Sequence, residues 1–301
     1  MTYPLSRREF LSSSIAVGAA LATGLPALAD APAKSVHNPI CVFTKYLQSL
    51  SYDELADAMA KLGVDGIETP IRKSGSSIKP EQAPEELPKL VEALAKRNLK
   101  VTMVTSDILD ANTPTARPLL QTAKQLGIPM YRLGFYRYDL NQPVLDQLKN
   151  VGAAVKEIAA LNKEVGIQGV YQNHAGAELV GATVWDFFNL IQDIPNHQLA
   201  LAFDLRHATV EAGLSWQTLY NAVRSRIATC YAKDFVWDGR KDGNAPLGKG
   251  RVDGKFYKQL LADGFTGPIS LHVEYLGDGT VQENLAAIKS DLGVLRSWLA
   301  A

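Results

Sequence analysis

Hydrophobic positions along the chain follow two alternating patterns. Short apolar runs rich in β-branched residues are typical of buried strands, and they recur at fairly regular intervals. These runs cover residues 40–45, 64–68, 100–105, 130–134, 167–173, 199–204, 227–233 and 268–274. Between and after them, apolar residues recur at helical spacing in residues 52–62, 85–97, 115–126, 143–165, 183–191, 216–223, 254–263 and 281–299. The pattern therefore predicts eight strand–helix units.

Glycines support these boundaries, because glycine is the preferred residue just past the last turn of a helix. Gly63, Gly127, Gly166 and Gly264 each follow a predicted helix directly. Strands that alternate with helices predict an α/β fold with a parallel sheet. Eight units in a chain of this length match a single (β/α)₈ TIM barrel. A doubly wound open sheet is the alternative, but its G-x-G-x-x-G marker is missing after the first strand.

The first 29 residues follow a different pattern. Residues 6–11 (SRREFL) match the S-R-R-x-F-L motif of twin-arginine signals, and residues 27–29 (ALA) form a small-x-small cleavage site. The apolar run between them is shorter than the roughly 20 residues that a spanning helix needs. We expect a twin-arginine signal peptide over 1–29 and one barrel domain over 30–301. The protein would then be periplasmic or otherwise exported by the twin-arginine translocase, without stable membrane insertion.

Composition bears on two questions: whether the protein binds nucleic acid and whether it contains a disulfide. The chain has 31 basic and 31 acidic residues, and this balance argues against a nucleic-acid partner. Its two cysteines, Cys41 and Cys230, lie inside predicted strands, so we expect buried free thiols and no disulfide.

Polar and charged side chains gather where the predicted strands end. The active site of a TIM barrel lies at that end, and buried charges there need a partner or a metal. The polar residues at or just after the strand ends are Lys45, Glu68, Arg72, Arg132, Gln172, Asn173, His174, Asp204, Arg206, His207, Lys233, His272 and Glu274. They predict a polar pocket at the barrel mouth. The longest loop, 237–250, follows the seventh strand and brings Trp237 to this pocket.

Four of these strand ends resemble the xylose-isomerase-like TIM barrels, which include sugar epimerases, hydroxypyruvate isomerase, inosose dehydratase and endonuclease IV. Residues 169–174 (GVYQNH) resemble the family's strand-five E-N-H, and 201–207 (LAFDLRH) its strand-six D-x-x-H. Residues 230–234 (CYAKD) resemble its strand-seven H-x-K-D, and 269–274 (ISLHVE) its strand-eight segment ending in a metal-binding Glu. As strand–helix order, the resemblance extends over the whole mature chain.

The resemblance implies a divalent metal site with Glu, Asp, His and Glu ligands, and the matching residues are Gln172, Asp204, Tyr231 and Glu274. Gln172 still offers a carbonyl oxygen that suits Mg²⁺ or Mn²⁺, whereas Tyr231 is a poor ligand for either. We expect Mn, Mg or Zn, held by Asp204, Glu274, Gln172 and His174.

A metal-free ionic network is the alternative. In it, Asp204 and Glu274 pair with Lys233, Arg132 or Arg206.

If a metal is bound, His207 is also spaced to complete the ligand set with the two carboxylates.

Such a site supports proton abstraction beside a carbonyl, because a metal or a cation stabilises the enediolate while a base removes the proton. We assign Glu274 as the base, His174 as the possible second base, and Lys233 as the group that stabilises the oxyanion, with Lys45 as an alternative. Gln172 cannot take a proton, which argues against symmetric two-base epimerisation.

The remaining candidates bind the substrate in this interpretation. They are Lys45, Glu68, Arg72, Arg132, Asn173, His207 and Trp237. Sugar phosphates are scarce outside the cytoplasm, so the sequence predicts an exported isomerase or epimerase acting on an unphosphorylated sugar or polyol. Two alternatives stay open: a lyase that performs β-elimination on a 3-keto-glycoside, and a non-catalytic sugar-binding barrel. A DNA-repair nuclease is disfavoured, because the strand-seven His and a basic surface are missing.

Overall fold

The structure is a computed structural model that describes residues 38–300. The predicted signal peptide over 1–29 lies outside the described residues, so the signal and the domain boundary at residue 30 stay predictions. No helix within residues 38–300 has the length and apolarity needed to cross a bilayer.

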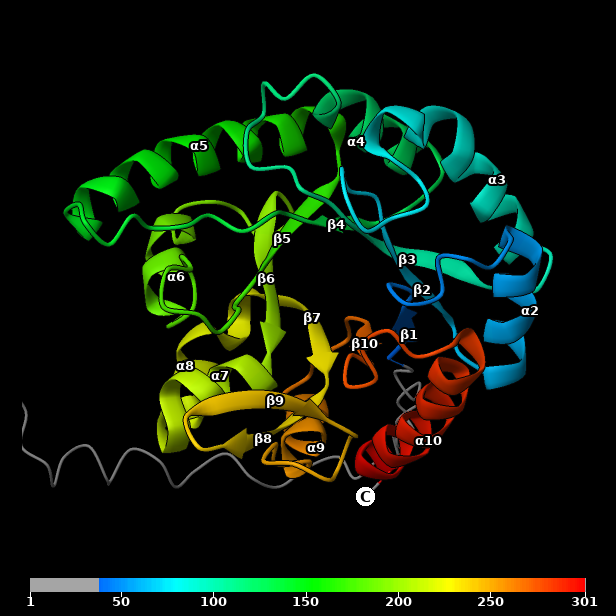
Figure 1. The fold of residues 1–301 in the computed structure, drawn as a ribbon. Coiled ribbons are helices and arrows are strands. Elements are labelled where there is room, and N and C mark those ends of the chain that lie inside the picture. The colour runs from blue at the N-terminus through cyan, green and yellow to red at the C-terminus, as the bar shows by residue number, and fades with distance from the viewer. Residues whose placement is uncertain (1–37, 301) are drawn as a thin grey trace, which may run out of the picture. The chain divides into compact units, whose positions relative to one another are not determined.

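Eight parallel strands close into a barrel in the order β1-β10-β7-β6-β5-β4-β3-β2, with helices around the outside (Figure 1). The barrel strands are β1 (Ile40–Phe43), β2 (Gly66–Pro70), β3 (Lys100–Thr105), β4 (Met130–Arg132), β5 (Gln168–Gln172), β6 (Leu199–Asp204), β7 (Ile227–Ala232) and β10 (Ile269–Leu271). Strand β1 pairs with both β2 and β10, which closes the sheet. The predicted single (β/α)₈ barrel is confirmed, and the open sheet is excluded.

The helices that surround the strands agree with most of the predicted helical segments. They are α2 (Tyr52–Leu62), α3 (Ala83–Ala95), α4 (Ala116–Gln125), α5 (Val144–Val165), α6 (Trp185–Ile191), α7 (Leu205–Ala212), α8 (Trp216–Val223), α9 (Lys255–Ala262) and α10 (Val281–Ala300), with short 3₁₀ turns η1 (Pro80–Gln82), η2 (Gly213–Ser215) and η3 (Arg224–Arg226). Helix α2 begins at a capping box of Ser51 and Glu54, and it ends at Gly63 with φ 65°. Arg296 of α10 donates to the Leu62 carbonyl at 3.0 Å, joining the last helix to α2.

Two local elements were not predicted, and both lie at the carboxyl end of the barrel. Helix α7 begins directly after β6, with the Asp204 side chain as its N-cap, accepting from the His207 N–H. Strands β8 (Asp234–Asp238) and β9 (Lys241–Ala245) form an antiparallel hairpin, although the sequence indicated only a long loop there.

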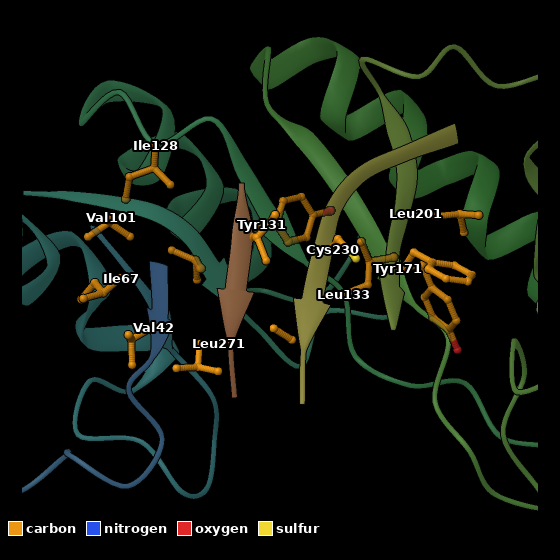
Figure 2. Close-up of a cluster of buried hydrophobic side chains, with 14 of the residues drawn as sticks. Val42, Ile67, Val101, Ile128, Tyr131, Leu133, Tyr171, Leu201, Cys230 and Leu271 are labelled. Atoms are coloured by element: carbon orange, nitrogen blue, oxygen red, sulfur yellow. The ribbon is translucent and has the colours of Figure 1, made fainter. Parts of the chain in front are cut away.

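Apolar side chains fill two separate spaces. The outer cluster lies between the strands and the helices, and Figure 2 shows part of it, including Val42, Ile67 and Leu271. A smaller cluster occupies the barrel interior and comprises Met103, Met130, Val170, Ala200, Ala202 and Tyr231. Cys41 and Cys230 are buried free thiols, as predicted. Because the barrel interior is apolar, the charged side chains gather at the carboxyl ends of the strands.

Candidate active site

The carboxyl ends of the strands bring two groups of interacting charges together. We call Lys45, Asp204, Lys233 and Glu274 the rim cluster, because Lys45 and Glu274 retain solvent exposure. We call Glu68, Thr105, Ser270 and His272 the floor cluster, because each of its side chains is buried.

The rim cluster is built around one ammonium group between two carboxylates. Lys233 Nζ lies 3.1 Å from Asp204 Oδ2 and 3.4 Å from Glu274 Oε2. Lys45 Nζ lies 2.9 Å from the other Glu274 oxygen, Oε1. The Lys233 side chain is 6% exposed and that of Asp204 is fully buried, so water screens their attraction little. Glu274, at 17% exposure, is the carboxylate that solvent reaches.

These charges keep Glu274 ionised. Burial alone would raise the pKa of Glu274, but Lys233, His272 and Lys45 together outweigh it and hold the pKa well below its usual range. Burial likewise acts to lower the pKa of Lys45, and the Glu274 carboxylate reverses that effect and raises it. The predicted base is therefore a carboxylate at neutral pH, placed against two cations.

Gln172 connects this cluster to Arg132. Arg132 Nη1 donates to Gln172 Oε1 at 3.0 Å, and Gln172 Nε2 donates to Asp204 Oδ2 at 2.7 Å. A guanidinium group can only donate, so the orientation of the amide is fixed. The predicted ligand oxygen of Gln172 faces Arg132, and its nitrogen faces Asp204.

Asn173 joins the ends of β5 and β6. Its Nδ2 donates to the Asp204 carbonyl at 2.9 Å, and its Oδ1 accepts from the Asp204 N–H at 2.7 Å. Both ends of the buried amide are used in this way, so the geometry gives Asn173 the role of holding Asp204. Its assignment to substrate binding stays a prediction that this geometry does not favour.

Two neutral histidines, His174 and His207, lie beside Asp204 and carry their protons on different ring nitrogens. Their ring centroids lie 3.8 Å apart. Arg206 Nη1 lies 3.0 Å from His207 Nδ1, which must accept, so Nε2 carries the proton. His174 Nδ1 lies 2.9 Å from the Ala175 carbonyl and must donate, so its Nε2 is the acceptor.

Burial and nearby cations keep both rings neutral. Burial, followed by Lys233, lowers the pKa of His174 to about 4. The same two causes, in the same order, hold the pKa of His207 well below its usual value. His207 Nε2 lies 3.6 Å from Asp204 Oδ2 and has no hydrogen-bond partner among the described residues. The pair thus presents one N–H donor and one acceptor at neutral pH.

The floor cluster fixes a third histidine. His272 Nε2 lies 2.9 Å from Glu68 Oε2, Ser270 Oγ donates to the same oxygen at 2.6 Å, and Thr105 Oγ1 donates to Oε1. Burial favours the neutral form of Glu68, but these partners, His272 foremost, lower its pKa. His272 Nδ1 lies 4.0 Å from Glu274 Oε2, so the floor cluster contacts the rim cluster through this ring.

The structure changes the roles expected for Glu68 and His272. Glu68 was expected to bind substrate, but it is fully buried and both of its oxygens accept from protein groups. Its geometry favours a supporting role, and substrate contact stays a prediction. His272 has the contacts of a site residue, yet no role was assigned to it from the sequence. Its two-residue spacing from Glu274 was the available signal, because both side chains then face the same way along a strand.

The β8–β9 hairpin lies over this end of the barrel near α7. Arg206 Nη1 lies 2.5 Å from Asp242 Oδ2, and its guanidinium lies 5.3 Å from the Phe235 ring centroid. Trp237 packs edge-on against Phe235 and is 44% exposed, so it is accessible to a ligand. The role of Arg206 was missed, because nothing in the sequence shows that one guanidinium joins the hairpin to His207.

Arg72 follows β2, with its guanidinium 5.9 Å from the Phe43 ring centroid. Its Nε is buried and has no hydrogen-bond partner among the described residues. Arg132 lies 4.6 Å from the Phe135 ring centroid. Substrate binding by both arginines stays a prediction.

Comparison with known proteins identifies the family of this chain. A family model described as xylose isomerase-like TIM barrel matches residues 56–298. The chain belongs to this family. No curated protein sequence matches the chain.

Solved structures with the same fold agree with this membership. D-psicose 3-epimerase from Clostridium cellulolyticum H10 has 12% identity and a TM-score of 0.65, covering 87% of this chain and 99% of its own. The 3-keto-D-glucoside 4-epimerase from E. coli has 14% identity and a TM-score of 0.66, covering 87% and 100%. A xylose isomerase-like TIM barrel protein from Mycobacterium smegmatis in complex with magnesium has 16% identity and a TM-score of 0.61, covering 87% and 97%. At these identities the likeness shows the fold alone.

The donor atoms at the family's four metal positions do not fit a divalent ion in this arrangement. Gln172 turns its amide nitrogen toward Asp204, and Lys233 lies between Asp204 and Glu274. Burial raises the pKa of the Tyr231 phenol well above its usual value, so the phenol stays protonated. Across residues 38–300, no group of three or more His, Cys, Asp or Glu is arranged to hold a metal ion.

The predicted ligand set of Asp204, Glu274, Gln172 and His174 is therefore not assembled as a metal centre. The physical reason lies in Gln172, whose amide oxygen faces Arg132 and whose nitrogen faces Asp204. His174 donates from Nδ1 to the adjacent carbonyl of Ala175, which leaves its Nε2 as an acceptor, so this histidine alone is not the reason.

Proposed function

We propose that this chain is an enzyme of the sugar isomerase and epimerase type, which removes a proton beside a carbonyl of an unphosphorylated sugar or of an oxidised (keto) polyol. The observation that carries the proposal is the ionised Glu274 carboxylate held against the Lys233 and Lys45 ammonium groups. Removing such a proton needs a base, and it needs a positive group for the oxygen that becomes negative. The rim cluster supplies both.

In the proposed reaction the substrate carbonyl oxygen takes up hydrogen bonds from Lys233. Glu274 then loses part of its cationic support, so its pKa rises toward the usual range and it becomes a stronger base. Glu274 removes the proton beside the carbonyl, and the enediolate oxygen is stabilised by Lys233. Return of the proton to the neighbouring carbon completes an isomerisation.

The neutral histidine pair fits the proton movements between oxygens. His207 Nε2–H can donate to an oxygen that gains negative charge, and its tautomer is set by Arg206. His174 Nε2 can accept the hydroxyl proton that must leave the neighbouring oxygen. Isomerisation moves both a carbon-bound and an oxygen-bound proton, so a donor and an acceptor in contact suit this chemistry.

Elimination is the second candidate, and Gln172 favours it. An amide cannot take or give a proton at this position, so the site lacks a second carboxylate acid–base group on β5. A single base that removes the proton, with an acid for the leaving group, is sufficient for β-elimination from a 3-keto-glycoside.

The test is solvent exchange. The purified protein is incubated in heavy water with free keto-sugars, aldoses, polyols and 3-keto-glycosides, and the products are followed by NMR. Deuterium at a substrate carbon together with an isomerised sugar supports the proposal. A new ultraviolet absorbance from a conjugated enone, with loss of the aglycone, selects elimination. Binding of a sugar without exchange at any carbon overturns both and selects the non-catalytic barrel.

We further propose that residues 1–29 export the protein, on the strength of the SRREFL motif and the ALA cleavage site. The mass of the mature protein should place its first residue at Asp30. Replacing Arg7 and Arg8 by lysine should retain the precursor in the cytoplasm. Normal export of that variant, or an exported protein that still carries residues 1–29, would contradict this part of the proposal.

A further inference from the structure

The rim cluster has its own cation in the place where the family pattern calls for a metal ion. Asp204 and Glu274 occupy two of the four ligand positions, and Lys233 Nζ lies within 3.1 Å and 3.4 Å of one oxygen of each. Lysine at this position belongs to the family pattern, so its presence alone decides nothing. What is particular to this chain is the chemistry of the other two ligand positions.

The first of these positions presents a donor where a metal needs an acceptor. Gln172 Nε2 donates to Asp204 Oδ2 at 2.7 Å, the oxygen that Lys233 also approaches. Arg132 accounts for this orientation, because it must donate to Gln172 Oε1. Turning the amide over would set its NH₂ against a guanidinium and its carbonyl against a carboxylate.

The second position offers a phenol in the barrel interior. The Tyr231 hydroxyl is buried and has no hydrogen-bond partner among the described residues. A protonated phenol is a poor ligand for a hard divalent ion. Neighbouring His207 does not replace it, because Arg206 occupies Nδ1 and leaves the proton on Nε2.

Charge leads to the same conclusion. The two carboxylates of the rim cluster are already balanced by the two ammonium groups of Lys45 and Lys233. A divalent ion at Asp204 would lie within a few ångströms of the Lys233 ammonium in a site that water hardly screens. Since buried like charges repel strongly, the ion would have to displace this lysine.

We infer that Lys233 is the built-in cation of this site, and that the site operates without a divalent metal ion. The inference deepens the proposed function and rests on it for the chemistry: the enediolate oxygen forms a charge-assisted hydrogen bond with Lys233 Nζ instead of a bond to a metal. The arrangement of the carboxylates around Lys233 can be tested separately from any activity.

The first experiment uses the purified mature protein. Its metal content is measured after purification and after treatment with EDTA, and its melting temperature is then followed during titration with Mn²⁺, Mg²⁺ and Zn²⁺. A bound ion would raise the melting temperature with its concentration. We expect no stoichiometric metal, no saturable rise, and, with a responsive sugar, the same exchange rate before and after EDTA. One retained ion per chain, or a saturable rise with any of the three metals, overturns the inference.

The second experiment compares Lys233→Met with a triple variant that adds Gln172→Glu and Tyr231→His to it. Without its ammonium, the Lys233→Met protein should melt at a lower temperature than the wild type in metal-free buffer. The triple variant has the full Glu, Asp, His and Glu set, and Mn²⁺ should raise its melting temperature while leaving the wild type unchanged. Equal melting of Lys233→Met and the wild type would contradict the role of Lys233.

These readouts separate the two proposals. If no sugar exchanges protons, the proposed function fails, while metal content and melting still decide whether Lys233 is the cation. If a sugar exchanges only after a metal is added, the proposed function stands and the inference fails.

Discussion

Glu68 in the floor cluster and Glu274 in the rim cluster are both carboxylates with lowered pKa values, but they are kept ionised by different partners. Glu68 is fully buried and accepts from two hydroxyl groups and an imidazole, all on short side chains. Glu274 is 17% exposed and contacts the ends of two long, flexible lysines. A substrate oxygen can take over the lysines, whereas the partners of Glu68 cannot move away without exposing a buried charge. We therefore interpret the floor as a support and the rim as the reactive part.

The largest expected effect separates the two clusters by activity. Glu274→Gln keeps the size of the side chain but removes the base, so the deuterium exchange rate should fall by about 10²- to 10⁴-fold. Its stability should change by about 1 kcal/mol or less, because Lys233 keeps Asp204 as a partner and Lys45 is partly exposed. Exchange by NMR and unfolding in urea measure the two quantities on the same sample. Full exchange by this variant would remove Glu274 as the base.

The next effect separates the clusters by stability. Glu68→Gln places an NH₂ group against donors that suit two carboxylate oxygens, and it removes the negative charge that faces His272. Breaking a buried charged pair costs roughly 3–5 kcal/mol, so the free energy of unfolding should fall by an amount of this order. Ser270→Ala is the matched control, since the loss of one hydrogen bond to a charged group costs about 1.5–3 kcal/mol. A Glu68→Gln protein as stable as the wild type would contradict the floor as a support.

The sequence was sufficient to predict the barrel and the side of it that carries the site. Strand periodicity and glycine stops predicted the eight units, and parallel strands then place residues such as Asp204 and Glu274 at one end. Both predictions depend only on local sequence, because the end of a strand can be recognised from a few neighbouring residues.

The contacts within the site could not be predicted in the same way. Glu68 and Ser270 are 202 residues apart in the chain, and only the closure of the barrel makes them partners. The orientation of Gln172 depends on Arg132, 40 residues away. Helix α7 was missed because Arg206 and His207 were interpreted as the end of a strand. The metal site was expected from residue types alone, and residue type does not show which atom faces inward.

Acid should act in different pH ranges on His174, which lies beside the rim cluster, and on Glu68 of the floor cluster. His174 has a folded pKa of about 4 against 6.5 when unfolded, so the unfolded state takes up its proton first and stability falls as the pH drops from 6.5 to about 4. Glu68 has a folded pKa below 4.5, so its contribution is present above pH 4.5 and is lost as the pH falls below that value. His174→Asn should flatten the upper part of the stability curve, and Glu68→Gln the lower part.

Urea unfolding at pH intervals from 7 to 3 measures both parts. Wild-type stability that stays level between pH 6.5 and 4 would show that His174 is not kept neutral by burial. Equal curves for Glu68→Gln and the wild type below pH 4.5 would show that the floor carboxylate is not held ionised by its partners.

The smallest effect tests whether the hairpin belongs with the rim. Arg206 is 5% exposed and Asp242 is 34% exposed, and Asn at position 242 keeps a side-chain oxygen that can accept from Arg206, so the loss of the charge should cost about 1 kcal/mol or less. Asp242→Asn is compared with Glu164→Gln, which breaks the fully surface pair with Arg117 at 2.6 Å. Both variants should lose similar, small stability, but only Asp242→Asn should slow the exchange reaction, because Arg206 also holds the tautomer of His207. Equal exchange rates in the two variants would mean that Arg206 holds His207 without help from the hairpin.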